Sequence, residues 1–409
     1  MTPVRSLLLL LITGCVSIGS DLMPTPVVYL EEEGVDPFRG LSQADQDPSL
    51  TVFYATDRGA KGTAAARGYT NEATDTVRLG KAAVRIGGER ITWPELHAAS
   101  RAAKRSHSLP LRFDHAAELG TLGNASGERA FADALNAELG RTRARVLNVY
   151  VHGYNVDFQN PCRVAAGLSH YMRGEGVWLA FAWPSHQNPL AYGADVRRSF
   201  EAAPHLALVL DFLSRRTRAT RINVVGNSAG TALVTEGLAL LRETYPERDE
   251  AGLRRLRIGT VVYSAAVLEW KVFSAALRRF QDLPGRISVL VSPDDAVLRT
   301  LGFFGSTRVG ATDPAQLTEE QRGALAAAQK VELIDATRTR VPGESGGFGG
   351  HFAWLTHSWV SSDVLVSLQY GLAPDARGLV AMKDRRAWYF PEDYPQRIVE
   401  IVRAARAER

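Results

Sequence analysis

Arg221-Ile-Asn-Val-Val-Gly-Asn-Ser228-Ala-Gly-Thr-Ala-Leu-Val234 is the stretch that decides the fold of this chain. Its β-branched run Ile222 to Val225 is typical of a strand buried on both faces. The residues after Gly230 carry apolar side chains at helical spacing. A strand that turns into a helix so quickly strains the backbone, and glycines at 226 and 230 remove bulk beside the turn. The pattern predicts that Ser228 presents its hydroxyl at a helix N-terminus, as an acyl-transfer nucleophile does.

The same five-residue pattern occurs a second time, at Gly343-Glu-Ser345-Gly-Gly347. That copy follows Pro342, has no strand before it and runs into more glycine, so we predict a flexible loop there. Ser228 has a simpler alternative role, as a serine that caps a buried helix. The choice between capping residue and nucleophile depends on whether the rest of the chain supplies catalytic partners.

Length and composition indicate an ordinary globular chain. Its 409 residues are 45% hydrophobic and 22% charged, which is enough apolar material for one large α/β domain or for two domains. The net charge of +4 comes mainly from scattered arginines, without a dense basic run. Solvated surface faces explain this pattern better than nucleic-acid binding, so we expect no nucleic-acid partner.

The N-terminus is predicted to be a targeting segment. Arg5 precedes a short apolar core at 7–12, and Ile12-Thr-Gly-Cys15 resembles the lipobox of bacterial lipoproteins. We therefore expect a signal peptide at 1–15 and a lipid on Cys15, with a plain secretory signal as the alternative. Val16 follows instead of aspartate, which favours the periplasmic side of the outer membrane. If Cys15 carries lipid, Cys162 has no partner for an intrachain disulfide.

The order of elements predicts that the chain has three regions. These are the signal peptide, a proline-containing tether at 16–48, and one domain at 49–409 that ends in a helical extension. Alternating strands and helices predict an α/β fold with a mostly parallel sheet covered by helices on both faces. We expect strands at 51–55, 76–86, 146–151, 177–182, 222–225, 258–263, 287–291 and 331–334. We expect helices at 94–105, 131–139, 161–172, 191–215, 231–241, 272–280, 321–330, 361–370 and 396–407, and a loop at 61–74.

A serine nucleophile needs a histidine base and an acid that orients the base. In α/β-hydrolases these residues follow the serine in the order acid, histidine. Pro293-Asp294-Asp295 follows a predicted strand, although adjacent aspartates before a helix are also typical of an N-cap. Only His351 and His357 come late enough to be the base, and Glu269 is a second candidate for the acid. His351 follows a glycine-rich loop that can aim its ring inward, whereas His357 lies where a helix-capping role is easily satisfied.

The oxyanion of an acyl intermediate needs two N–H donors. The residue after the nucleophile, Ala229, is expected to supply one. The second should come from the loop after an early strand, where the sequence has His152-Gly153-Tyr154. Gly153 allows close backbone approach, so we predict the Tyr154 N–H as the second donor. His152 is expected to shape this turn and not to transfer protons.

Several motifs in the right order resemble the bacterial esterase/lipase-superfamily hydrolases catalogued as a domain of unknown function. These motifs are Phe53-Tyr-Ala-Thr56-Asp-Arg58, Val151 to Asn155, Trp183-Pro184, Ser292 with Asp295, and His351 with Trp354, Val360 and Asp363. The family's usual His-Ser-Met-Gly elbow is replaced by Asn227-Ser228-Ala229-Gly230. The resemblance spans about residues 51 to 375, implies the α/β-hydrolase fold, and favours Asp295 and His351 as acid and base without defining a substrate.

The sequence therefore predicts a lipid-anchored serine hydrolase of the bacterial envelope, similar to a carboxylesterase or lipase, with Ser228, His351 and Asp295 as catalytic residues. Its substrate would be a small-molecule or lipid acyl ester. No metal-binding or nucleotide-binding motif is found, so we expect no cofactor and no metal. The alternative is a non-catalytic envelope lipoprotein that keeps the hydrolase fold as a binding or scaffold module.

Overall fold

The computed structural model describes residues 19–407 except 32–33, 247–249, 303–306, 338–349 and 383–385. The predicted signal peptide with Cys15, and the second serine pattern at Ser345, lie outside these residues. Within them, eleven strands form one sheet in the order β10-β11-β9-β8-β7-β6-β4-β5-β1-β2-β3. The strands are β1 Ser49–Gly62, β2 Arg67–Ile86, β3 Leu111–Thr121, β4 Val146–Val151, β5 Gly176–Phe181, β6 Arg221–Asn227, β7 Ile258–Ser264, β8 Arg286–Val291, β9 Val331–Asp335, β10 Val380–Ala381 and β11 Ala387–Tyr389.

The centre of the sheet is parallel, from β5 through β4, β6, β7 and β8 to β9. Every residue of β4 is buried, as is every residue of β6 except Arg221. Strands buried on both faces read as continuous apolar runs, which is why the sequence pattern located them well. Antiparallel pairs occur only towards the two ends of the sheet, in β1-β2-β3 and β10-β11, among the described residues.

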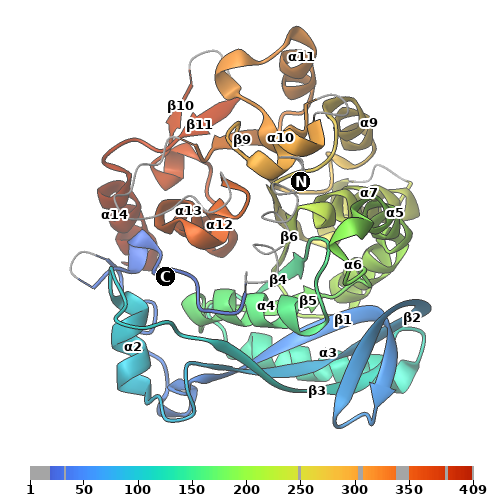
Figure 1. Cartoon of the computed structure of the whole chain (residues 1–409), viewed down its shortest axis with the longest axis vertical. Helices are drawn as coiled ribbons and strands as arrows, with labels where there is room; N and C mark the ends of the chain where they lie inside the picture. The colour runs from blue at the N-terminus through green and yellow to red at the C-terminus, as the bar shows by residue number, and fades with distance from the viewer. Residues whose placement is uncertain are drawn as a thin grey trace, which may run out of the picture.

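Helices cover both faces of the sheet, as predicted (Figure 1). The α-helices are α2 Trp93–Arg101, α3 Ala125–Gly140, α4 Gln159–Tyr171, α5 Tyr192–Glu201, α6 Ala203–Arg216, α7 Ala229–Thr244, α8 Glu250–Leu256, α9 Trp270–Phe280, α10 Ala296–Gly302, α11 Glu319–Ala327, α12 Ala353–Thr356, α13 Ser358–Tyr370 and α14 Tyr394–Ala407. One core lies under α3, α6, α7 and α9, and the other under α2, α4, α13 and α14. None of the helices in the described part of the chain is long and apolar enough to cross a membrane.

Two predictions about secondary structure were wrong. The single helix expected at 191–215 is two helices, because Pro204 in the first turn of α6 cannot continue the hydrogen bonds of α5. The loop expected at 61–74 is mostly the hairpin of β1 and β2, and β3 was not predicted. Much of this hairpin is exposed to solvent, so its residues lack the apolar alternation that identifies a strand.

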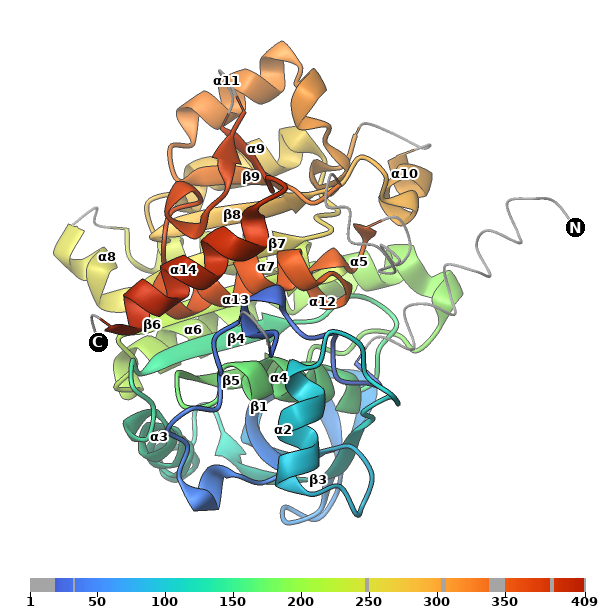
Figure 2. The ribbon, with the colours of Figure 1, turned by 90° about the vertical axis from the view of Figure 1, so that its left-hand side faces the viewer.

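The expected tether at 16–48 is also wrong for its described residues. Leu22, Val28 and Tyr29 are buried in the core of the domain. The Arg105 guanidinium donates hydrogen bonds to the carbonyl oxygens of Leu22 and Met23, at 2.7 Å each. Figure 2 shows this segment running between α13 and the pair α2 and α4. Prolines and acidic residues suggested a linker, but the apolar side chains between them are what the core accommodates.

Candidate active site

The strand–turn–helix around Ser228 has the geometry that the sequence predicts. Ser228 lies between the end of β6 and the start of α7, with a φ angle of 50°. A non-glycine residue in this region costs about 1–3 kcal/mol and persists only where its surroundings hold it. The Ser228 N–H donates to the Ser264 carbonyl of β7 at 2.9 Å, and the Ser228 carbonyl accepts from the Thr231 N–H at 2.9 Å. The strained serine is thus held by the neighbouring strand on one side and by α7 on the other.

Close backbone approach explains the glycine two residues after the serine. A Cβ atom at position 230 would lie 2.4 Å from the His152 carbonyl oxygen, which is too close for any side chain. Glycine at 230 therefore lets α7 start against the end of β4. This contact brings the loop after β4 to the nucleophile.

The structure brings Asp295 and His351 together from elements 56 residues apart. His351 Nδ1 lies 2.8 Å from Asp295 Oδ2, and both side chains are buried. The second carboxylate oxygen accepts the Leu298 N–H at 2.9 Å, so the same aspartate also caps the start of α10. Asp294, its neighbour in the sequence, is exposed. Burial distinguishes the two aspartates, which sequence reasoning could not separate by pattern alone.

Two polar atoms at the centre of this arrangement have no hydrogen-bond partner among the described residues. They are Ser228 Oγ and His351 Nε2, and both are buried. Both side chains line one small pocket of about 20 Å³, which has room for roughly one water-sized group. Leaving a buried polar atom unpaired costs about 1–3 kcal/mol, so two such atoms facing one pocket are typical of a reactive site.

The loop after β4 runs directly past the serine. A Cβ atom at Gly153 would lie 3.0 Å from the Ser228 Cβ, so the backbone there is as near as it can come. Tyr154 lines the same pocket as Ser228, and its ring packs edge-on against Tyr192 at 5.3 Å. Ala229 is the first residue of α7, so its N–H has no helical carbonyl partner. Ala229 and Tyr154 are therefore both neighbours of the serine, and their role as oxyanion donors stays a prediction.

His152 has a structural role, as predicted. Its ring stacks on Trp183 at 5.0 Å between centroids, and the Trp183 indole N–H donates to the His152 carbonyl at 2.8 Å. Burial, with a smaller effect from the nearby Arg58 guanidinium, lowers the pKa of His152 to about 3. The ring is therefore neutral at physiological pH and serves to join the loop after β4 to the loop after β5.

The buried Arg58 explains the Phe53–Arg58 motif of β1. Its guanidinium donates to the Val156 carbonyl at 2.9 Å and to the Ala182 carbonyl at 3.2 Å. These two carbonyls belong to the loop after β4 and to the end of β5. Burial lowers the pKa of Arg58 to about 10, so it stays charged at neutral pH. The motif thus holds the loops that border the nucleophile, although Arg58 lies outside the pocket.

Asp57, next to Arg58, makes a separate ion pair. Its buried carboxylate lies 2.8 Å from Nδ1 of His205 on α6. This hydrogen bond raises the pKa of His205 above its ordinary value. The pair connects β1 to α6 and does not line the pocket that contains Ser228.

Asp195 is a supporting residue that sequence reasoning missed. This buried aspartate of α5 accepts the Asn155 N–H at 3.1 Å and the His186 N–H at 2.6 Å. It therefore connects the loop after β4 to the loop after β5. An aspartate in the first turn of a helix is common, so the sequence carried no signal that distinguishes this one.

Three other residues singled out by the sequence lie outside the reactive centre. His357 caps α13 by accepting the Trp359 N–H at 3.2 Å, which is the capping role predicted for it. Asp363 makes a buried bidentate ion pair with Arg377, at 2.6 and 3.0 Å. Glu269, the second candidate for the acid, pairs with Arg308 at 3.2 Å and is partly exposed.

Asn227 explains how the unusual elbow is accommodated. Its side-chain oxygen accepts the Trp354 indole N–H at 3.1 Å. Trp354 is fully buried three residues after His351, so this bond connects the elbow to the segment that carries the histidine.

In the part of the chain that the structure describes, no group of three or more His, Cys, Asp or Glu side chains is placed to bind a metal ion.

A strained serine between a strand and a helix, on a mostly parallel sheet with helices on both faces, defines an α/β-hydrolase. The chain belongs to the family described as alpha/beta hydrolase of unknown function (DUF900), whose model matches residues 127–347. That match includes Ser228 and Asp295 and ends four residues before His351. A comparison with curated proteins found no match.

Proposed function

We propose that this protein is a serine hydrolase that cleaves acyl esters through a covalent acyl-enzyme. One observation carries the proposal. Ser228 Oγ and His351 Nε2 are buried, have no partner among the described residues and face the same pocket, while Asp295 holds the other nitrogen of the histidine. Apo enzymes often have a loose contact between nucleophile and base that tightens when substrate binds. This arrangement therefore supports proton transfer between the two residues.

Each residue then has a defined role. Ser228 Oγ attacks the ester carbonyl while His351 Nε2 takes the hydroxyl proton, and Asp295 stabilises the resulting imidazolium. The N–H groups of Ala229 and Tyr154 bind the oxyanion of the tetrahedral intermediate. His351 returns the proton to the leaving alcohol. A water molecule, activated by the same histidine, then attacks the acyl-enzyme and releases the acid.

A serine-directed fluorophosphonate probe tests this proposal. The wild-type protein should be labelled, and Ser228→Ala should lose the labelling, because the serine oxygen displaces fluoride from phosphorus. Ser345→Ala is the matched control and should be labelled like the wild type, since it removes the serine of the second pattern. Labelling that persists in Ser228→Ala, or that disappears in Ser345→Ala, contradicts the assignment.

The scaffold alternative makes the opposite prediction. A non-catalytic lipoprotein would turn over no acyl ester, and Ser228→Ala would leave the cellular phenotype unchanged. The φ angle of Ser228 and the two unpartnered buried atoms argue against it. Both features cost stability, and a scaffold would gain nothing from keeping them.

We also propose that Cys15 carries a lipid that anchors the protein to the bacterial outer membrane, facing the periplasm. Gly19, the first described residue, lies beside Asn160, which lines the pocket of Ser228. Four residues span at most about 14 Å, so such an anchor would keep the site close to the membrane surface. Cys15→Ser should move the protein from the membrane fraction to the soluble fraction. Unchanged membrane association in that variant would contradict the proposal.

A further inference from the structure

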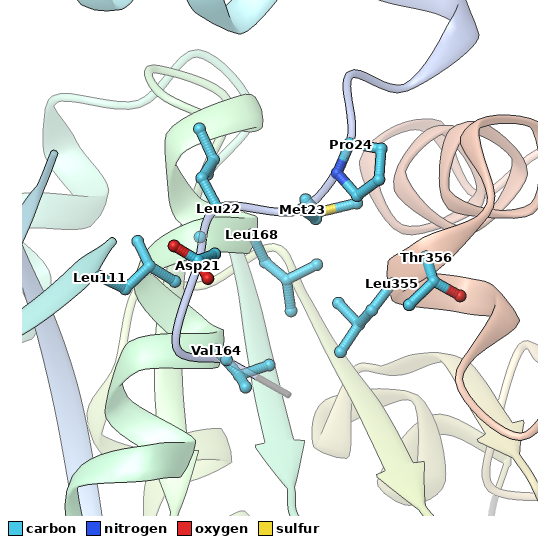
Figure 3. A pocket seen from close by; sticks show the side chains of 11 residues that line it. Asp21, Leu22, Met23, Pro24, Leu111, Val164, Leu168, Leu355 and Thr356 are labelled. Atoms are coloured by element: carbon cyan, nitrogen blue, oxygen red, sulfur yellow. The ribbon is translucent and has the colours of Figure 1, made fainter. Parts of the chain in front are cut away.

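A second pocket lies beside the reactive one, between α4, α12 and the N-terminal segment at 19–24. Its volume is about 180 Å³. Its walls are mainly apolar and include Leu22, Met23, Leu111, Val164, Leu168 and Leu355. Figure 3 shows Val164 and Leu168 on α4 facing Leu355 on α12 across the pocket, with the N-terminal segment along one side.

The residues that line the two pockets are one helical turn apart on α4, and four positions apart in the segment that contains α12. On α4, Asn160 lines the pocket of Ser228 and Val164 lines the apolar pocket. At the other wall, Phe352 lines the first pocket and Thr356 the second. Four residues of an α-helix rise by about 6 Å, which is the length of a few methylene groups. A chain bonded to a carbonyl carbon at Ser228 could therefore continue into the apolar pocket.

The N-terminal segment is a fixed wall of this pocket. A Cβ atom at Gly19 would lie 2.6 Å from Val164 Cγ2 and 3.3 Å from Asn160 Nδ2, so the segment begins at the boundary between the two pockets. The Leu22 N–H donates to the Leu109 carbonyl at 2.7 Å, and the Leu111 N–H donates to the Ser20 carbonyl at 2.7 Å. These bonds hold the segment in the manner of an added strand next to β3.

We propose that this apolar pocket binds the acyl chain of the substrate, and that residues 19–24 form its wall. This inference rests on the proposed ester hydrolysis at Ser228 and names its substrate class. An apolar cavity of about 150 Å³ accepts benzene, so 180 Å³ has room for about six to eight carbons. The substrate is therefore an ester of a medium-length fatty acid, not of acetate or palmitate.

The test measures kcat/KM for p-nitrophenyl esters from acetyl to palmitoyl. We expect a maximum between decanoyl and dodecanoyl in the wild type, because the carbonyl carbon and the few methylene groups between the two pockets add to the roughly six to eight carbons in the apolar pocket. Val164→Phe narrows the pocket and should lower kcat/KM for the decanoyl ester about fifteenfold, because it excludes about two methylene groups and each costs about fourfold. Met23→Ala widens the pocket and should move the maximum towards tetradecanoyl. Acetyl hydrolysis should fall much less than hydrolysis of the longer esters in Val164→Phe, because an acetyl group is too short to reach this pocket.

Val27→Ala is the matched control for Met23→Ala. Val27 is a buried side chain three residues after this segment and does not line this pocket, so its truncation loses packing without widening the site. The control should lower thermal stability like Met23→Ala and leave the chain-length profile unchanged. A profile that is unchanged in Val164→Phe and Met23→Ala, with acetyl activity retained, overturns the acyl-pocket proposal and leaves the hydrolase proposal standing.

A binding measurement separates the pocket from the catalysis. Calorimetric titration of Ser228→Ala protein with methyl decanoate should show binding, and adding Val164→Phe should weaken that binding at least tenfold. Binding of this kind by a wild-type protein that hydrolyses no ester would refute the hydrolase and keep the pocket. Absence of binding in Ser228→Ala overturns the pocket assignment, whatever the wild type hydrolyses.

Discussion

Replacing Asp295 by asparagine tests the proposed acid most sharply. In the wild type, Asp295 Oδ2 accepts a hydrogen bond from the His351 Nδ1–H at 2.8 Å, while Oδ1 accepts one from the Leu298 N–H at 2.9 Å. In Asp295→Asn the amide oxygen can keep the Leu298 bond, which leaves the amide NH₂ facing the histidine. A donor at that position makes Nδ1 an acceptor and moves the ring proton to Nε2. The nitrogen that should take the serine proton is then already protonated.

The expected loss follows from this wrong tautomer. The corresponding replacement in a serine protease lowers kcat about 10⁴-fold, which is about 5.5 kcal/mol of transition-state stabilisation. We expect a loss of this size in Asp295→Asn, because the hydrogen-bonded pair is buried and water cannot replace the lost acceptor. The substitution is nearly isosteric and keeps the cap of α10, so the thermal midpoint should fall by only a few degrees.

The assay is steady-state hydrolysis of a p-nitrophenyl ester, with thermal unfolding measured on the same samples. Asp294→Asn is the matched control, since it removes the same charge from the exposed neighbouring position. It should retain activity within about threefold of the wild type. The reasoning is refuted if folded Asp295→Asn protein keeps more than a tenth of the wild-type kcat, or if Asp294→Asn loses as much activity as Asp295→Asn.

Further predictions concern the base, the loop beside the nucleophile and the pH dependence of stability. His351→Ala should lower kcat for ester hydrolysis by about three to four orders of magnitude. His357→Ala should keep most activity but lower the stability of the protein, because it removes the cap of α13. The reverse order of activities would assign the base to His357. Gly153→Ala should lower kcat/KM at least tenfold, because the Cβ of the new alanine would lie 3.0 Å from the Ser228 Cβ and displace the loop after β4. Wild-type kinetics in this variant would show that catalysis tolerates a displaced loop. His205 has a raised pKa in the folded protein through its bond to Asp57, so its stabilising effect is complete below about pH 6.5 and is lost as pH rises through the folded value. Urea unfolding should therefore show a stability gap between wild type and His205→Gln that shrinks from pH 6 to pH 9, and a gap that grows with pH would contradict this sign.

Local chemistry made the centre of the fold predictable. The strand predicted at 146–151 has those bounds in the structure, and the strand at 222–225 is the middle of β6. Both are mostly apolar because helices cover a central parallel strand on both faces. Burial on both faces therefore produces a run of apolar residues that a short stretch of sequence shows. The strained turn at Ser228 was equally predictable, because its two glycines lie within five residues of chain, although the contact that requires glycine at 230 comes from the distant His152 carbonyl.

Exposed elements carried a weaker signal. The sequence did not indicate β3, and the outer part of the β1–β2 hairpin was predicted to be a loop, because strands that face solvent have no apolar run to detect. Single supporting residues were also hidden. Asp195 and Arg58 form hydrogen bonds with backbone groups of distant loops. Nearly every residue type has a backbone carbonyl and an N–H, so the sequence of those loops does not indicate which side chain they bind.

The sequence by itself thus determined the fold class, the elbow at Ser228 and a short set of possible partners, because each depends on residues that are neighbours in the chain. The tertiary structure added which of the candidates, one or six positions apart in the chain, contact each other. It buries Asp295 and exposes Asp294, and it places His351 against the carboxylate while His357 caps α13. It also shows that part of the expected tether, residues 19–24, lines the apolar pocket. The physical reason is that burial and contact are set by what packs from the other side, and those residues lie tens to hundreds of positions away.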